Sequence, residues 1–404
     1  MGKVWWIAIL ALAVVSAGMG SRRLLLMTTL FALIGLASHL WTRHSLDAVT
    51  YRRRFGSRRV LYGEETELQV EITNAKPLPL AWLRAEDEFP ADLQITPPML
   101  GYGRPGRRSL INLLSMRWYE RVTRHYQVRG TRRGAWALGP VRLSSGDIFG
   151  FAVQRETRDD VEDLVVYPKT VPITALGLPA HHPFGDLRTH RRVLEDPLLV
   201  MGARDYAPGD SFRHIHWRAT ARRQALQTKV FEPSATRPIA IFLNVNTYEY
   251  VYEGIDLELQ ELAITAAASI ARWAWEQGLQ VGLFANSITQ PTGERVRIMP
   301  GSHTDQLLWI MEALARLVIY GRWPIESVLQ VESFGLRYGT TVVVISAVIT
   351  ERLRQTLLDL RRREHAVTLI ALGDARLAYP LPGVGYYHIG GREVWRELEG
   401  LELA

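Results

Sequence analysis

The sequence contains no cysteine among its 404 residues. Disulfide frameworks, thiolate zinc sites and cysteine nucleophiles are therefore excluded, and redox chemistry would need a bound cofactor. Lysine is also scarce, so arginine supplies nearly all the positive charge, and 48 basic against 41 acidic residues give a formal net charge of +7. The arginines are spread along the chain without a recognition motif, so we do not expect nucleic-acid binding.

Several catalytic motifs are missing as well. The chain has no Gly-x-x-x-x-Gly-Lys-Ser/Thr phosphate loop, no Gly-x-Ser-x-Gly, no His-Glu-x-x-His, and no Gly-x-Gly-x-x-Gly after the first strand of its C-terminal region. These absences argue against P-loop nucleotide hydrolysis, a dinucleotide site and the common hydrolases. We expect no enzyme and no cofactor. With 47% apolar and 22% charged residues, the chain can build cores in two or three domains.

Two uncharged, largely apolar runs stand near the start of the sequence, Val4–Ser21 and Leu24–Thr42, separated by Arg22 and Arg23. Each is long enough to cross about 30 Å of hydrocarbon at about 1.5 Å per helical residue. They predict a two-helix transmembrane hairpin in residues 1–42. The alternative for the first run is a cleaved signal peptide, which leaves the second run as the span.

The charges around the second run predict its orientation. Six arginines follow it, against the single acid Asp47: Arg43, Arg52, Arg53, Arg54, Arg58 and Arg59. Positive charge close to a span stays in the cytoplasm, and these six outweigh the two arginines between the runs. We therefore predict a multi-pass plasma-membrane protein with cytoplasmic soluble domains. Residues 43–59 are predicted to be a basic juxtamembrane linker that lies against anionic headgroups.

Residues 60–172 show the periodicity of strands. Glu67 to Ile72 alternates polar and apolar side chains, and turn signals follow at Asn74–Pro77 and Pro97–Pro98. Short strands between regular turns predict a small all-β antiparallel sandwich. Such a domain can be a binding module or a spacer, and we favour the spacer because no site is visible.

Residues 173–404 are predicted to form an α/β domain. Pro238–Val245 is a nearly continuous apolar run, as expected for a strand covered on both faces. Helical patterns alternate with this run and with three further strand patterns, at residues 279–285, 340–346 and 366–372. The alternation predicts a parallel, doubly wound sheet, in which ligands bind at the carboxyl ends of the strands.

The densest group of polar and aromatic residues lies between Asp196 and Glu232. Our candidate signature and interaction residues there are Arg204, Asp205, Tyr206, Gly209, Asp210, Arg213, His216, Trp217 and Arg222. They can form a network of salt bridges or a recognition surface. An enzyme site at Arg204, Asp205, Asp210 and His216 is the alternative. Nearby histidines, including His181, His182, His190 and His214, have a spacing that fits no known metal-ligand pattern.

A strand is predicted within this segment. Ile215 and Trp217 alternate with His214 and His216, as on a half-buried strand. We therefore expect Trp217 to be largely buried and the arginines to pair with the aspartates.

The same segment resembles the signature of the "domain of unknown function 58" (DUF58) family. The matching residues are Gly202, Arg204, Asp205, Tyr206, Gly209, Asp210, Arg213, Ile215, His216, Trp217, Thr220, Ala221, Arg222, Leu226, Lys229, Phe231 and Glu232. Upstream, Arg129–Pro140, Asp147–Gly150 and Val165–Pro168 are similar to further elements of the family, with Ile148 in place of its usual proline.

The resemblance implies a role in protein interaction. Members of the family resemble von Willebrand factor A domains in their C-terminal part, and they are commonly encoded beside MoxR-type AAA+ ATPases. They are thought to act with these ATPases in membrane-associated, chaperone-like assembly, and no catalytic activity is established for them. The resemblance thus implies a membrane-anchored adaptor with a protein partner; a structural cell-envelope protein is the alternative.

The resemblance also bears on metal binding. Von Willebrand A-like domains that hold a divalent ion use Asp-x-Ser-x-Ser after the first strand and an aspartate after a later one. The corresponding positions here are Asn244, Asn246, Thr247 and Ser346, so the carboxylates are missing. Mg²⁺ gives up its water reluctantly and needs charged oxygens, so we expect no metal. Asn244 and Asn246 are predicted to satisfy backbone groups in the turn, while the edge can still bind a partner's carboxylate or peptide.

Overall fold

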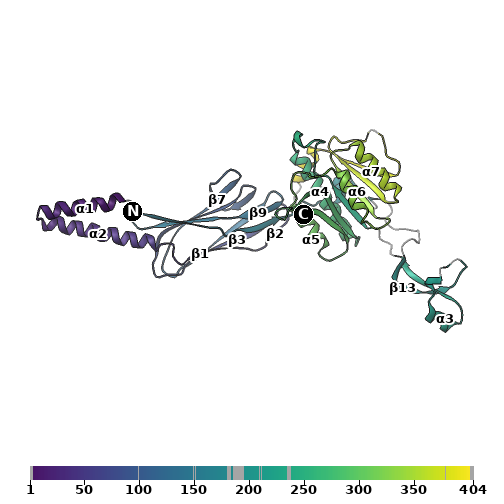
Figure 1. The fold of residues 1–404 in the computed structure, drawn as a ribbon, viewed down its shortest axis with the longest axis horizontal. Coiled ribbons are helices and arrows are strands. Elements are labelled where there is room, and N and C mark those ends of the chain that lie inside the picture. Colours follow the sequence, from purple (N-terminus) through teal and green to yellow (C-terminus); the bar gives the residue numbers. More distant parts are fainter. Residues whose placement is uncertain are drawn as a thin grey trace. The chain divides into compact units, whose positions relative to one another are not determined.

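The computed structural model describes residues 3–98, 100–148, 150, 152–179, 183–184, 195–208, 210, 212–233, 238–377 and 379–400. The chain divides into two compact units, residues 1–168 and 169–404. Figure 1 shows helices and strands of both units, which are described separately below.

Unit 1 begins with two antiparallel apolar helices, α1 (Lys3–Gly18) and α2 (Arg22–Arg43), which lie side by side at the purple end of Figure 1. Of the helices in the described part of the chain, α2 is the one long and apolar enough to cross a membrane, with 22 residues. α1 has 16 residues. The structure therefore supports one candidate span and not the predicted pair.

The rest of unit 1 is built from strands. One sheet has the order β1-β3-β8-β5, with bounds Val49–Phe55, Glu65–Asn74, Arg121–Gly130 and Leu93–Thr96. A second has the order β11-β10-β4-β7-β6, with bounds Val153–Arg158, Val141–Gly146, Leu80–Pro90, Arg107–Met116 and Leu100–Tyr102. A third has the order β2-β12-β9, with bounds Arg59–Val60, Glu162–Val166 and Gly134–Leu138.

The first two sheets share one hydrophobic core. Leu68, Val70 and Ile72 on β3 are fully buried and belong to the same cluster as Leu83 and Leu110 of the second sheet. The alternation that predicted β3 is therefore the alternation between this core and the surface. Residues 49–55, which fall in the stretch predicted as a basic linker, form β1 and pair with β3 along their whole length.

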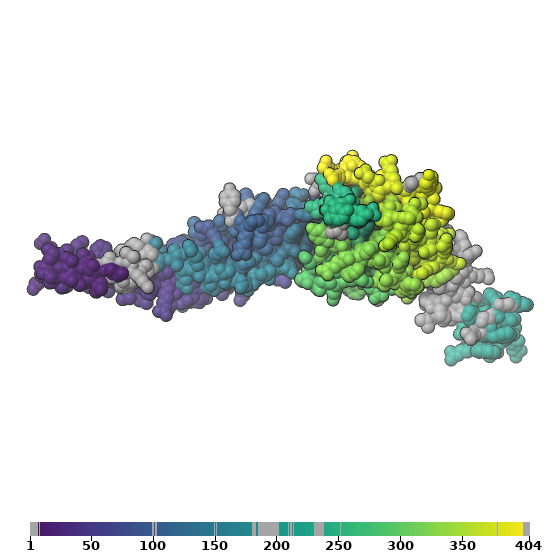
Figure 2. Space-filling model, turned by 45° about the horizontal axis from the view of Figure 1, so that its top comes forward, coloured from purple at the N-terminus to yellow at the C-terminus, as the bar shows by residue number. Residues whose placement is uncertain are grey.

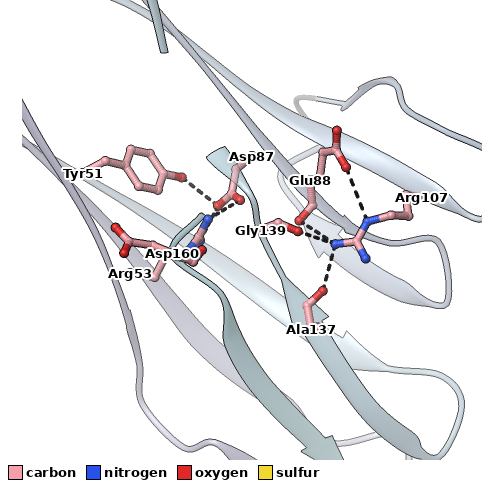
Figure 3. A network of polar contacts seen from close by, with 8 residues as sticks. All are labelled: Tyr51, Arg53, Asp87, Glu88, Arg107, Ala137, Gly139 and Asp160. Atoms are coloured by element: carbon pink, nitrogen blue, oxygen red, sulfur yellow. Dashed lines mark hydrogen bonds and ion pairs between the residues drawn. The ribbon is translucent and has the colours of Figure 1, made fainter. Parts of the chain in front are cut away.

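One arginine of the basic stretch is buried between these two sheets. The Arg53 guanidinium donates from Nε and Nη2 to the Asp87 carboxylate at 2.7 and 2.6 Å, and its Nη1 donates to the Asp160 carbonyl at 2.7 Å (Figure 3). The Tyr51 hydroxyl donates to the same carboxylate at 2.8 Å. Burial, and then the Asp87 charge, raise the pKa of Tyr51 well above its usual value. Arg53 thus joins β1 to β4 and does not face lipid headgroups, contrary to our expectation for the stretch.

A second arginine in Figure 3 connects β7 with the chain around β9. Nη2 of Arg107 donates to the carbonyls of Gly139 at 2.6 Å and Ala137 at 3.0 Å, and its Nε lies 3.7 Å from the Glu88 carboxylate. These contacts give carbonyl groups in and after β9 a side-chain donor.

Unit 2 contains a six-stranded sheet of order β17-β16-β15-β18-β19-β20, parallel except for β17. In chain order its strands are β15 (Ile239–Leu243), β16 (Val281–Ile288), β17 (Arg295–Gly301), β18 (Thr341–Ser346), β19 (Ala366–Leu372) and β20 (Val384–Ile389). The mostly parallel sheet is confirmed, and its edge strands β17 and β20 are additions to the prediction.

Helices cover both faces of this sheet. They are α4 (Leu257–Glu276), α5 (Gln306–Ala315), α6 (Ile325–Ser333), α7 (Glu351–Arg362) and α8 (Arg392–Gly400). α4 contacts α5 and α8, whereas α6 packs with α7 over a core in which the rings of Phe242 and Phe284 stack at 4.7 Å. Thr350 caps α7 as predicted, and Gly278 follows α4 with a left-handed φ of +70°. Figure 2 shows the atoms of these elements, green to yellow, as a closely packed body.

Three short elements and a β-hairpin complete the described part of unit 2. The 3-10 helices are η1 (Ile173–Leu176), η2 (Phe212–His214) and η3 (Val251–Glu253). β13 (Glu195–Asp205) and β14 (Gln227–Pro233) form an antiparallel two-stranded sheet, and α3 (Trp217–Arg223) lies in the connection between them.

Candidate interaction site

The carboxyl ends of β15, β16 and β18 lie at one edge of the parallel sheet. β15 pairs with β16 on one side and β18 on the other, in registers that place Leu243 beside Ala285 and Ile345. The next residues along the three strands are Asn244, Asn286 and Ser346. This is the edge at which open α/β sheets bind ligands.

A chain of neutral hydrogen bonds connects these three residues. Asn286 Nδ2 donates to Asn244 Oδ1 at 2.8 Å, and Asn244 Nδ2 donates to Ser346 Oγ at 2.9 Å. The Ser346 hydroxyl donates in turn to the Val348 carbonyl at 2.6 Å. Asn244 is 6% exposed and the other two are fully buried. The base of the edge is therefore a closed, uncharged network.

The amide oxygens of this network accept backbone N–H groups of the surrounding loops. Asn244 Oδ1 accepts from Asn246 N at 3.2 Å, and Asn286 Oδ1 accepts from Val245 N at 2.9 Å. Asn246 Oδ1 accepts from Gly321 N at 3.0 Å. Asn244 thus satisfies a backbone group in the turn after the strand, as predicted, whereas Asn246 satisfies one in the α5–α6 connection.

Gly321 must be a glycine because the network passes so close to it. A Cβ atom at this position would lie 2.6 Å from both Asn246 Oδ1 and Asn286 Nδ2. Beside it, Gln260 Nε2 donates to the carbonyls of Val245 at 2.8 Å and Ile319 at 2.7 Å. The α5–α6 connection is thus held against the β15–α4 loop.

The residues at the four positions that correspond to von Willebrand A metal ligands do not fit a divalent ion. Their oxygens are neutral and already engaged with N–H donors, and Thr247 Oγ1 accepts from Asp256 N at 2.8 Å. The Asp256 carboxylate caps α4 by accepting a hydrogen bond from Leu259 N. It also accepts one from Arg392 Nε at 2.5 Å. Within the described residues, no group of three histidine, aspartate or glutamate side chains could hold a metal ion.

Exposed tyrosines lie on the two loops that this network holds together. Tyr248, Tyr250 and Tyr252 on the β15–α4 loop are 39, 50 and 84% exposed, and Tyr320 on the α5–α6 connection is 49% exposed. The rings of Tyr250 and Tyr252 stack at 5.3 Å. In Figure 2 the green atoms near residue 250 lie at the surface of unit 2. Tyrosine supplies large contact area with a polar tip, which is why it is enriched in protein interfaces.

The signature segment folds differently from the prediction. His216 is the N-cap of α3, and its Nδ1 accepts from Ala219 N at 3.2 Å. Trp217 is therefore the first residue of a short helix and not part of a strand, and its side chain is 69% exposed. Ile215 is buried and forms an isolated antiparallel bridge with Thr228, as expected for a half-buried strand position. The pairing does not continue to Trp217, where α3 begins, so the predicted burial of Trp217 is wrong.

The predicted pairing of arginine with aspartate is confirmed in this segment. Arg204 Nη2 lies 2.5 Å from Asp210 Oδ1, and Asp210 Oδ2 accepts from Ala207 N at 3.0 Å and Thr228 Oγ1 at 3.2 Å. The Arg204 hydrogen bond, followed by that of the Ala207 backbone, lowers the pKa of Asp210 to about 2. Asp210 thus fixes the turn between β13 and η2.

The other signature residues have separate partners. Asp205 Oδ1 accepts from Gln227 Nε2 at 2.5 Å and lies 3.8 Å from Arg223, and the Tyr206 ring stacks on Phe212 at 5.8 Å. The four residues considered as an alternative enzyme site, Arg204, Asp205, Asp210 and His216, are therefore each engaged in a hydrogen bond within this segment. Arg222 is exposed. Gly209, the side chain of Arg213, and the three upstream histidines His181, His182 and His190 lie outside the described residues.

Asn286, Gln260 and Gly321 did not emerge from the sequence. Asn286 stands in an apolar strand without a motif around it, and its partner Asn244 is 42 positions away. The one available signal was the polar pair Asn286–Ser287 at the end of an apolar run. Parallel strands bring such ends to one edge, so this pair could have been assigned there.

Solved structures with local similarity cover less than a third of the chain. The CARDB domain of a Pyrococcus furiosus protein in complex with di-metal ions is 12% identical, with a TM-score of 0.21 over 29% of this chain and 91% of that one. A non-cellulosomal cohesin from Archaeoglobus fulgidus is 16% identical, with a TM-score of 0.19 over 27% of this chain and 88% of that one.

Sequence comparisons find a curated relative and a family model. The uncharacterized protein YeaD of Bacillus subtilis (strain 168) is 24% identical over 246 residues, which are 60% of this chain and 56% of that protein. The chain thus spans about half the length of this curated relative. Residues 202–399 match the family model described as protein of unknown function DUF58. Unit 2, with its parallel sheet and neutral carboxyl edge, therefore carries a domain of the DUF58 family.

Proposed function

We propose that this protein is a membrane-anchored adaptor that docks a protein partner on the carboxyl edge of the parallel sheet. The observation that carries the proposal is the pairing of a closed, neutral network with a rim of exposed tyrosines. The network through Asn244, Asn286 and Ser346 makes the edge rigid, and the rim supplies aromatic contact area. Rigid aromatic side chains make good binding anchors because few rotamers are lost on association.

We further infer that unit 2 is a degenerate von Willebrand A-like domain. A mostly parallel sheet with helices on both faces supports this, as does the position of Asn244, Asn246, Thr247 and Ser346 at its carboxyl edge. Binding at this edge then proceeds without a bridging ion. Calorimetric titration of the full chain with Mg²⁺ and Mn²⁺ should give no saturable heat at millimolar ion, and a 1:1 isotherm that is lost in Asn244→Ala would refute the inference.

A MoxR-type AAA+ ATPase is the partner we propose, in a chaperone-like assembly at the membrane. The support is the signature around Arg204, Asp205 and Trp217, together with the DUF58 match over residues 202–399. The chemistry of the edge suits a peptide: Arg322 is exposed beside Tyr320 and can pair with a carboxylate, and the tyrosine hydroxyls can bond to main-chain groups.

The anchor in this proposal is α2, with α1 entering the same bilayer beside it. The 16 residues of α1 cover about 24 Å at 1.5 Å per residue, most of the hydrocarbon thickness. The arginines that follow α2 support a cytoplasmic location of both soluble units in this proposal. Reporter fusions at the C-terminus should be active only for a cytoplasmic reporter.

Photo-crosslinking tests the docking surface in the full chain. A photoreactive phenylalanine replaces Tyr252, which is 84% exposed at the rim, or Tyr338, which is 51% exposed before β18 at the opposite edge of the sheet. The substitution at Tyr252 should crosslink to an AAA+ ATPase in native cells, and the one at Tyr338 should not. Equal crosslinking from both positions would contradict the proposed surface.

A further inference from the structure

The last turns of α2 are packed into the strand region of unit 1. Gly35, Ser38 and Thr42 are buried helix residues, and Ser38 Oγ donates to Asp147 Oδ2 at 2.6 Å. Ser38 and Asp147 are 3 and 2% exposed, so this bond is shielded from solvent. The β10–β11 connection therefore lies directly against the C-terminal part of α2.

The two carboxylate oxygens of Asp147 join this connection to α2 and to its own last residue. Oδ2 accepts a hydrogen bond from the Ser38 hydroxyl, and Oδ1 accepts one from Ala152 N at 3.1 Å. The carboxylate thus closes a short loop next to the helix. Ile148, the residue after Asp147, is 67% exposed, and Val153 at the start of β11 is 47% exposed. The loop sequence from Asp147 is Asp-Ile-Phe-Gly-Phe-Ala-Val, which is rich in large apolar residues.

The depth of this loop follows from the length of α2. A helix needs about 20 residues to cross the roughly 30 Å hydrocarbon core, and α2 has 22. Ser38 lies five residues before Arg43, which is about 7–8 Å along the axis at 1.5 Å per residue. Since α2 has almost no length to spare, a spanning α2 carries Ser38 at least as deep as the membrane interface. Asp147, bonded to Ser38, reaches the same level.

A second loop of exposed aromatic residues lies at the same end of unit 1. Lys76 Nζ donates to the carbonyls of Ser45 and Asp47, both at 2.6 Å, just after α2 ends. The Lys76 carbonyl accepts from Tyr119 N at 3.2 Å in the β7–β8 turn. In that turn Trp118 and Tyr119 are 65 and 67% exposed. Tryptophan and tyrosine are the residues that concentrate at membrane–water interfaces.

We propose that the β10–β11 loop and the β7–β8 turn form a second membrane contact, inserted into the interfacial layer of the bilayer that α2 crosses. The partner of this surface is lipid, because both loops are bonded to the C-terminal end of α2 or to the residues that follow it, and their exposed residues have the composition of an interfacial belt. The strand region is then fixed against the membrane at several points. This inference rests on the membrane anchoring of the proposed function.

Single-cysteine labelling can test the contact, because the native chain has no cysteine. Ile148→Cys carries a polarity-sensitive fluorophore in the full-length protein, reconstituted in phosphatidylcholine and phosphatidylglycerol vesicles that contain nitroxide-labelled lipids. Thr157→Cys is the matched control, since it is exposed on β11 four residues after Val153, about 13 Å further along the strand. Leu30→Cys, on the exposed apolar surface of α2, reports on the anchor itself.

We expect the lipid quencher to remove most of the fluorescence at positions 30 and 148 and little at position 157. Quenching at position 30 with equal, weak quenching at 148 and 157 would overturn the second contact and leave the anchor intact. No quenching at position 30 would overturn both. If Ile148→Cys does not reconstitute, Trp118→Cys replaces it, with the same expectation and the same contradicting result. If the fluorophore at position 148 reports an apolar environment only after a membrane-protein extract is added, the surface binds a protein and the proposal is overturned.

Discussion

Asn286 Nδ2 donates to the side-chain oxygen Oδ1 of Asn244 at 2.8 Å, across the ends of two adjacent parallel strands. The two residues directly follow the register pair Leu243 and Ala285, so the bond continues the pairing of β15 with β16 beyond its backbone ladder. A buried amide pair carries no charge and fills its own hydrogen-bonding capacity. It therefore makes a firm base for a binding edge but gives a cation nothing to replace its water.

The close approach at Gly321 predicts a steric effect on this network. In Gly321→Ala the new Cβ would meet Asn246 and Asn286 side-chain atoms at 2.6 Å, so the network must shift. We expect a loss of about 1–3 kcal/mol in the free energy of unfolding, the usual range for overpacking. Gly202→Ala is the control, because no atom lies within 4 Å of its Cβ. Unfolding of the full chain in detergent measures both, and equal stability of the two variants would contradict the packing.

The burial of Arg53 predicts that replacing it lowers the free energy of unfolding far more than replacing its neighbour Arg52 does. Arg53→Met strands the buried Asp87 carboxylate without its cation, which should cost about 3–5 kcal/mol of unfolding free energy. Arg52→Met, at an exposed position on the same strand, should change stability by less than about 0.5 kcal/mol. Denaturant unfolding gives both values. A small effect at Arg53 would show that it does not join the sheets.

Lys76 predicts that stability rises with pH in the alkaline range. Burial lowers the pKa of Lys76 to about 8 in the folded chain, whereas an unfolded lysine titrates near about 10.4. Between these values the unfolded chain binds more protons, so the cost of the buried charge is fully present below pH 8 and is lost progressively as the pH rises toward about 10.4. Stability measured from pH 8 to 10 should rise less steeply in Lys76→Met than in the native chain. Lys229→Met, in unit 2, should keep the native slope; the account fails if both variants lose it equally.

Trp217 predicts a small effect on stability despite its size. Its side chain is 69% exposed on α3, so Trp217→Ala should change the unfolding free energy by about 0.5 kcal/mol or less. A buried tryptophan would instead cost about 3–5 kcal/mol. Thermal melting of the full chain decides between these values. Unchanged melting together with weaker partner binding would identify the signature segment as a recognition surface.

The sequence predicted the elements whose pattern is strong and local. Leu68, Val70 and Ile72 alternate with polar residues because one face of β3 is core, and the apolar run at 238–245 marks a strand covered on both faces. It did not predict β17, an edge strand on which Val296 is the one buried side chain, so the strand shows no continuous apolar run.

The polar networks could not be predicted in this way, because they depend on contacts between residues distant in sequence. The partnership of Asn244 with Asn286 requires the register of two strands, and the burial of Arg53 requires Asp87, 34 positions away. At Trp217 a local alternation indicated a strand, but a histidine cap on a short helix used the same residues differently. Periodicity describes which face is apolar, and it does not reveal which polar groups meet.

The most direct test of the account measures partner binding at the tyrosine rim. The full-length protein in lipid nanodiscs is titrated with the purified MoxR-type ATPase from the same cells, as the native chain, as Tyr250→Ser with Tyr252→Ser, and as Tyr338→Ser. Tyr338 is 51% exposed, close to the 50% of Tyr250, so Tyr338→Ser controls for removing an exposed tyrosine at the opposite edge of the sheet. Loss of two interface anchors should weaken binding by about tenfold or more, while Tyr338→Ser should bind like the native chain. Equal affinity of all three proteins for the ATPase would contradict docking at this edge.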